Sequence, residues 1–226
     1  MRRISQTFEK LKTSGRRGFI PFVSVGDPDL ATSKEIVLAI AQNGADIVEL
    51  GVPFSDPMAD GPTIQASSMR ALENGVSLAE ILGMVVEVRK ETDVPIVLFS
   101  YLNPLYRYGI EQLAEDAATA GVDGVLVTDV VDEEASQIGR IVGGSGLDLI
   151  SLVAPTTSDE RLKVIAENAS GFIYAVSRAG VTGAQDSTSS SAEILFDRVR
   201  RFTDLPVAVG FGISTRQQIE DVWQYA

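Results

Sequence analysis

The chain has 226 residues, a formal net charge of −12, and neither His nor Cys. This length suits one large α/β domain, and the acidic charge argues against binding to nucleic acid or anionic membrane surfaces. The lack of Cys excludes disulfides and thiolate catalysis, and without His a transition-metal site would be unusual. Any proton transfer must therefore use carboxylates, Tyr, Lys or water. Neither a signal peptide nor a membrane span is predicted, so we expect a cytoplasmic protein.

Short apolar runs rich in β-branched residues alternate with amphipathic patterns along the chain. The predicted strands cover residues 19–25, 46–50, 94–101, 124–127, 147–153, 171–176 and 205–209. The predicted helices cover residues 4–11, 31–43, 63–73, 78–90, 110–120, 133–142, 159–168, 192–202 and 215–226. Asp29, Ser77 and Ser158 are expected N-caps. Strict alternation of strand and helix predicts a parallel sheet with right-handed crossovers.

The repeat of roughly 25–35 residues favours a (β/α)8 TIM barrel, formed by residues 1–226 as a single domain. Seven strands are too many for a flavodoxin-like sheet, and no G-x-G-x-x-G follows the first strand to support a Rossmann fold. Only seven strands are predicted before the chain ends, so we expect a barrel truncated after the seventh βα unit, with strand 8 and helix 8 missing. Strands one and seven would then each expose an unpaired edge.

Two carboxylates flank the loop that follows the second predicted strand. Glu49 closes an apolar segment, where loss of water raises a carboxyl pKa toward the range useful for acid–base catalysis. Glu49 could equally be a structural ion-pair partner. Asp60 precedes Gly61-Pro62 at a predicted helix start, so the simplest interpretation is an N-cap. Asp56, before a proline, is most simply a turn residue.

Two glycine-rich segments follow later strands. Residues 177–184 could bind phosphate, form a lid, or be an ordinary loop, whereas Gly210-Phe211-Gly212 leads into a helix N-terminus, which suits phosphate. Three aromatic residues at strand ends could line a pocket for a flat ligand, although core packing is the commoner role of such residues. They are Phe22, Tyr101 and Tyr174.

The segment Glu49–Pro62 closely resembles the signature of the tryptophan synthase alpha subunit family, and further motifs match in order. These lie at residues 19–22, 26–28, 101–104, 152–157, 177–184 and 210–213. The resemblance implies a TIM barrel that cleaves indole-3-glycerol phosphate to indole and glyceraldehyde 3-phosphate. It also implies that the chain needs no cofactor or metal of its own. Indole would pass to a beta subunit that carries pyridoxal phosphate, in an alpha2-beta2 assembly.

The same resemblance implies roles for individual residues. Glu49 matches the general acid/base and Asp60 the acceptor of the indole N–H. The positions that match substrate contacts are Phe22, Tyr101, Tyr174, Arg178, Thr182, Gly183, Gly212 and Ile213. Arg178 and Thr182 belong to the loop that resembles the family's closing lid.

Some positions depart from the family pattern. In the family, prolines usually flank an Asp in the loop after the fourth strand, and this loop helps contact the beta subunit. Here Thr128 and Val131 take the place of these prolines. The change therefore concerns coupling to the beta subunit rather than the cleavage chemistry. Leu102 replaces a common second Tyr. Two alternatives remain. One is a non-catalytic truncated partner of the beta subunit. The other is a different phosphate-binding barrel enzyme, such as indole-glycerol-phosphate synthase or a sugar-phosphate isomerase. The lack of a catalytic Lys or His at the strand ends counts against the latter.

Overall fold

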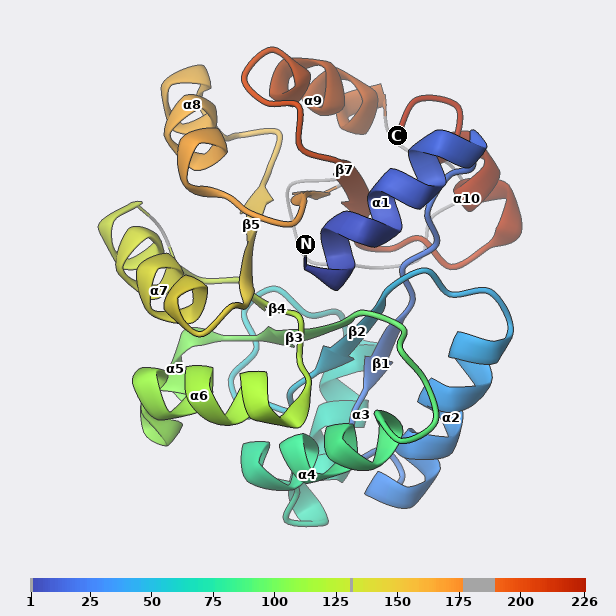
Figure 1. The fold of residues 1–226 in the computed structure, drawn as a ribbon, viewed down its shortest axis with the longest axis vertical. Helices are drawn as coiled ribbons and strands as arrows, with labels where there is room; N and C mark the ends of the chain where they lie inside the picture. Colours follow the sequence, from blue (N-terminus) through green and yellow to red (C-terminus); the bar gives the residue numbers. More distant parts are fainter. Residues whose placement is uncertain (1, 131, 177–189) are drawn as a thin grey trace.

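The computed structural model describes residues 2–130, 132–176 and 190–226. Its strands form one parallel sheet in sequence order, and helices cover the outside of that sheet (Figure 1). The strands are β1 Phe22–Ser24, β2 Val48–Gly51, β3 Ile96–Ser100, β4 Gly124–Val127, β5 Asp148–Val153, β6 Ile173–Val176 and β7 Val207–Gly210. The seven predicted strands and their parallel pairing are confirmed.

The helices follow the predicted order with one addition. They are α1 Arg3–Ser14, α2 Leu30–Gln42, α3 Pro62–Glu73, α4 Leu78–Val88, α5 Leu102–Tyr108, α6 Ile110–Ala120, α7 Asp132–Gly144, α8 Asp159–Asn168, α9 Ser190–Arg200 and α10 Arg216–Val222. Asp29, Ser77 and Ser158 accept backbone N–H groups as N-caps, as predicted. The short helix α5 was not predicted, and α10 ends earlier than expected. No helix in the described ranges is long and apolar enough to cross a membrane.

Side chains alternate across the sheet, as the period of two in a strand requires. On β2, Val48 and Leu50 are buried in the cluster that includes the core residues of α4 and α6. The residue before them, Ile47, belongs to the inner cluster with Val97 and Tyr174. The inner side is therefore a packed apolar core, typical of a barrel interior. Glu49, between Val48 and Leu50, is directed into this core.

Helix α1 is fixed at the amino-terminal ends of the strands. The Arg2 Nη1 atom lies 2.5 Å from Asp148 Oδ1, and Arg3 Nη1 lies 3.0 Å from Asp123 Oδ1. Both carboxylates are almost fully buried, and Ile4 is buried in the inner core. These contacts seat α1 against the residues that begin β4 and β5.

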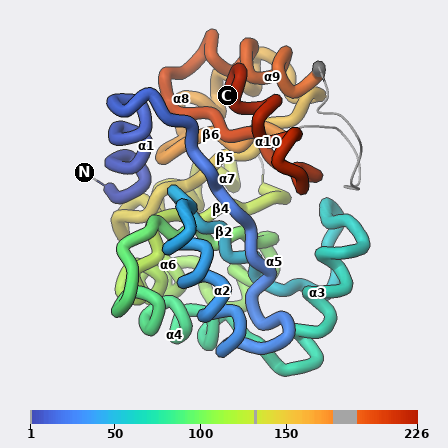
Figure 2. Tube along the Cα trace, turned by 90° about the vertical axis from the view of Figure 1, so that its right-hand side faces the viewer, coloured from blue at the N-terminus to red at the C-terminus, as the bar shows by residue number. Residues whose placement is uncertain are grey.

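The sheet is open between its first and last strands within the described part of the chain. β1 pairs only with β2, and β7 only with β6, so each keeps one edge without a ladder partner. Helix α10 lies beside the segment that leads into β1 (Figure 2). Trp223 Nε1 donates to the Gly18 carbonyl at 3.0 Å, and Arg17 Nε donates to the Trp223 carbonyl at 3.0 Å. We call the opening between β1 and β7 the seam. These two hydrogen bonds bridge it.

Candidate active site

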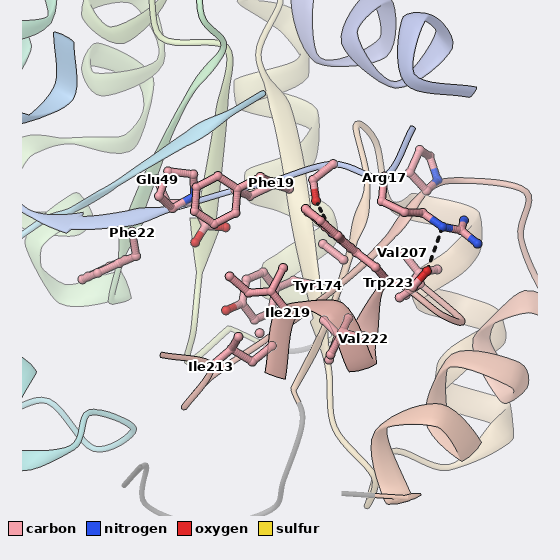
Figure 3. Close-up of a pocket in the computed structure, with 18 of the residues that line it drawn as sticks. Arg17, Phe19, Phe22, Glu49, Tyr174, Val207, Ile213, Ile219, Val222 and Trp223 are labelled. Atoms are coloured by element: carbon pink, nitrogen blue, oxygen red, sulfur yellow. Dashed lines mark hydrogen bonds between the residues drawn. The ribbon is translucent and has the colours of Figure 1, made fainter. Parts of the chain in front are cut away.

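A cavity of about 810 Å³ runs from the loops after β2 and β7 along the seam to α1 and α10. In Figure 3, Glu49, Phe22, Tyr174 and Ile213 lie toward one side of this cavity, and Trp223 lies toward the seam. The structure brings together many of the predicted site residues on the cavity wall. These are Phe22, Glu49, Asp60, Tyr174, Gly212 and Ile213.

Glu49 is a buried carboxyl group in the middle of β2. Its backbone N–H donates to the Pro21 carbonyl at 2.9 Å, and β3 pairs with it on the other side, so the strand fixes its position. Only 2% of the residue is exposed, and its Oε1 atom has no hydrogen-bond partner among the described residues. Burial raises the pKa of this carboxyl from 4.5 to about 8. The group is therefore protonated at pH 7 and can act as an acid.

Aromatic rings form one wall of the cavity beside Glu49. Phe99 meets Phe22 edge-to-face, with ring centroids 5.4 Å apart, and meets Tyr174 in the same way at 5.9 Å. Tyr174 in turn contacts Phe211 at 5.7 Å. Edge-to-face rings make a rigid apolar surface that suits a flat ligand. Sequence reasoning missed Phe99 and Phe211, although Phe99 lies two residues after the inward-facing Val97.

Asp60 lies on the cavity wall just before α3. The interpretation of Asp60 as an N-cap is wrong for this structure, because Gly61 occupies that position and α3 has no side-chain cap. Pro62 begins the helix and has no N–H to be capped. The Asp60 carboxylate is therefore not used as a cap, and Asp60 lines the cavity instead. Burial raises the pKa of this carboxyl, and a hydrogen bond from Tyr101 opposes that rise. Asp56 lies in a bend and is exposed, as expected of a turn residue.

The turn after β7 lines the cavity at its carboxyl-terminal end. A side chain at Gly210 would place its Cβ 1.8 Å from the Tyr174 hydroxyl, so glycine is required there. Gly212 and Ile213 follow on the cavity wall, and Gly212 has a φ of 72°, which favours glycine. The next backbone N–H groups, of Ser214 and Thr215, donate to the side chain of Gln218. The Ser214 and Thr215 N–H groups are thus bound within this turn, whereas Gly212 and Ile213 line the cavity.

The remaining predicted site residues are not among the described residues of the cavity wall. Arg178, Thr182 and Gly183 fall outside the described residues, as does Val131. Tyr101 is only 4% exposed and is absent from the described residues that line the cavity, where it was expected. Within the described ranges, no group of three or more His, Cys, Asp or Glu side chains is placed to hold a metal ion.

The family model described as "Tryptophan synthase alpha chain" matches residues 8–226. The chain belongs to the tryptophan synthase alpha chain family. It is similar to the alpha chain of Geobacter sp. (strain M21), with 50% identity over 100% of this chain and 85% of that protein. The alpha chain of Acidiphilium cryptum (strain JF-5) is 48% identical over 100% of this chain and 82% of its own length.

Solved tryptophan synthase structures share the fold. A tryptophan synthase structure from Mycobacterium tuberculosis superposes with a TM-score of 0.93 at 37% identity, covering 100% of this chain and 86% of that chain. A structure of the a2b2 tryptophan synthase complex from Pyrococcus furiosus gives 0.86 at 42% identity, covering 92% of this chain and 84% of that chain. The predicted resemblance and the predicted barrel fold are thus confirmed. Membership in the tryptophan synthase alpha chain family makes the chain a lyase subunit of tryptophan biosynthesis.

Proposed function

We propose that this chain cleaves indole-3-glycerol phosphate to indole and glyceraldehyde 3-phosphate, with Glu49 and Asp60 as its catalytic acids. The observation that carries the proposal is the buried Glu49 carboxyl, whose pKa of about 8 keeps it protonated at neutral pH. It shares one cavity with a second carboxylate and with aromatic rings that can pack against an indole. Family membership supports the same reaction.

The reaction needs one proton to move in and one to move out. Glu49 donates its proton to indole C3, which places positive charge on the ring nitrogen, and Asp60 stabilises that charge by accepting the indole N–H. The bond from C3 to the glycerol side chain then breaks, and its electron pair restores the indole ring. The adjacent hydroxyl becomes the aldehyde and returns its proton to Glu49. The step balances without an oxidant or reductant.

Substrate binding divides between the two ends of the cavity. The rings of Phe22 and Tyr174 hold the indole, and the backbone N–H groups of Gly212 and Ile213 bind the phosphate, as backbone amides do elsewhere. The resemblance adds Arg178, Thr182 and Gly183 on the loop after β6 as further substrate contacts.

The chain needs no cofactor for this step, because every proton transfer is assigned to a side chain. Pyridoxal phosphate would be held by a beta subunit. This chain would form an alpha2-beta2 assembly with that subunit, like the a2b2 complex solved from Pyrococcus furiosus. We place the reaction in the cytoplasm. Thr128 and Val131 would affect communication with the beta subunit rather than the cleavage itself.

Indole release from indole-3-glycerol phosphate tests the proposal. The purified chain, assayed with and without a beta subunit from a relative, should release indole, and Glu49→Gln should abolish the release. Glu115→Gln, an exposed carboxylate on α6, is the matched control. Loss of activity in both variants, or equal release by Glu49→Gln and the unmodified chain, would contradict the assignment of Glu49.

The open seam favours a second candidate, a non-catalytic partner. The cavity is continuous with the gap between β1 and β7, so one side of the substrate site has no strand in the described residues. Such a chain would bind a beta subunit and change its rate while releasing no indole. The same two measurements, indole release and the beta subunit's rate on mixing, separate the two functions.

A further inference from the structure

We propose that the Tyr101 hydroxyl is a positioning group, which holds Asp60 and its loop against the cavity and does not itself contact the substrate. This inference rests on the proposed function, since it concerns the carboxylate that would accept the indole N–H. It assigns Tyr101 a different task from the substrate contact that the sequence resemblance implies.

Tyr101 contacts the Asp60 loop at two places. Its hydroxyl accepts the backbone N–H of Ala59 at 2.9 Å and donates a hydrogen bond to the Asp60 carboxylate. Its ring packs on Phe54, with centroids 5.2 Å apart and the planes tilted by 34°. One side chain therefore holds the loop near its beginning and again at the catalytic residue.

Tyr101 and Asp60 differ in their access to the cavity. Only 4% of Tyr101 is exposed, and it does not line the cavity in the described part of the chain, whereas Asp60 does. Tyr101 is thus buried next to Asp60 and off the described cavity wall. A substrate in the cavity meets the Asp60 carboxylate, and Tyr101 fixes where that carboxylate lies.

The backbone under Tyr101 is itself anchored. β3 ends at Ser100, and Tyr101 is the N-cap residue of α5. The next N–H, of Leu102, donates to the carboxylate of Asp129 at 2.7 Å, from the loop after β4. This bond fixes the start of α5 from a third element. The Tyr101 ring then has a rigid base from which to hold the Asp60 loop.

The charges around the hydroxyl set its protonation. Asp60 and Asp129 both face Tyr101, and Glu49 lies on the same cavity wall as Asp60. Burial first, and then Asp60 and Asp129, raise the pKa of Tyr101 to about 12 against the opposing effect of the Ala59 N–H bond, so the hydroxyl stays a donor at neutral pH. Its bond lowers the pKa of Asp60 against the effect of burial. Removing the hydroxyl should therefore raise the pKa of Asp60.

Tyr101→Phe tests the inference, because phenylalanine keeps the ring and its contact with Phe54. In this variant we expect the Asp60 carboxyl resonance to titrate at higher pH and the Ala59 amide to exchange faster with solvent. Where the unmodified chain releases indole, kcat should fall about tenfold to a hundredfold with little change in KM, as loss of a bond to a charged group predicts. The acid side of the rate profile should move to higher pH.

Tyr106→Phe is the matched control, since Tyr106 is an exposed tyrosine within α5, the helix that begins directly after Tyr101. It should leave the Asp60 titration, the Ala59 exchange and kcat unchanged. If Tyr101→Phe raises KM instead, with an unchanged Asp60 titration, Tyr101 is a substrate contact and the inference is wrong. The titration and exchange measurements need no turnover, so they decide the inference even if the unmodified chain releases no indole, a result that would count against the proposed function alone.

Discussion

Replacing Glu49 by Gln should remove activity and at the same time stabilise the protein. In the folded state burial holds the pKa of this carboxyl at about 8, compared with an ordinary value of 4.5. The folded form therefore binds a proton that the unfolded form releases between these two pH values. Stability is lost as pH rises through this window, by about 1.4 kcal/mol per pH unit. At pH 7 the buried carboxyl thus lowers the free energy of unfolding by about 3 kcal/mol relative to a neutral group.

The pH dependence of the stability difference is the decisive measurement. Urea unfolding of the unmodified chain and of Glu49→Gln should be followed between pH 5.5 and 8.5. The advantage of the variant should grow by nearly 3 kcal/mol from pH 5.5 to pH 7.5, as two pH units predict, and level off above pH 8. Glu115→Gln, on the exposed face of α6, should show no such trend. A difference between Glu49→Gln and the unmodified chain that stays constant across this range would refute the reasoning.

Three further predictions rest on the described contacts. The pH profile of kcat/KM for indole release should decline above pH 8, because Glu49 must be protonated to donate to indole; a profile flat to pH 9.5 would rule this out. Gly210→Ala should lower the free energy of unfolding by about 1–3 kcal/mol, and it should cost less in a chain that also carries Tyr174→Leu, because that change removes the atoms that the new Cβ meets; additive costs of the two changes would argue against the clash. Arg89→Ala should lower the free energy of unfolding by about 3 kcal/mol, because it removes one of the two arginines paired with the buried Asp123 carboxylate, together with the Arg89 bonds to the Gly121 and Val94 carbonyls. Lys90→Ala, which breaks an exposed pair, should cost less than about 1 kcal/mol, and equal costs would contradict the role of burial.

Much of the fold could be predicted because its signals are local. Parallel strands buried on both faces are continuous apolar runs, and each of the seven predicted runs overlaps an observed strand. Hydroxyl and carboxylate caps are equally local, which is why Asp29, Ser77 and Ser158 were found. The helix α5 was missed because it has seven residues, a proline in its first turn and no side-chain cap.

The candidate site could be predicted only in part, for a physical reason. The apolar flanks of Glu49 were enough to predict its burial and raised pKa, since both depend on neighbours in sequence. Asp60 and Tyr101 depend on each other across 41 residues, and nothing local indicates that the carboxylate is bound by a phenol rather than by helix N–H groups. Phe211, at a φ of 69°, adopts a backbone conformation that its residue type does not predict.

The attachment of α1 affects the order in which the chain can assemble. Arg2 and Arg3 leave the ribosome long before Asp148 and Asp123, which bind them and follow 146 and 120 residues later. At about 5–20 residues per second, the helix would wait roughly 6 to 30 s for these carboxylates. During synthesis α1 therefore remains undocked while β1 to β3 form. Contacts of such long sequence separation also slow refolding from denaturant, so the docking of α1 should be among the late events there as well.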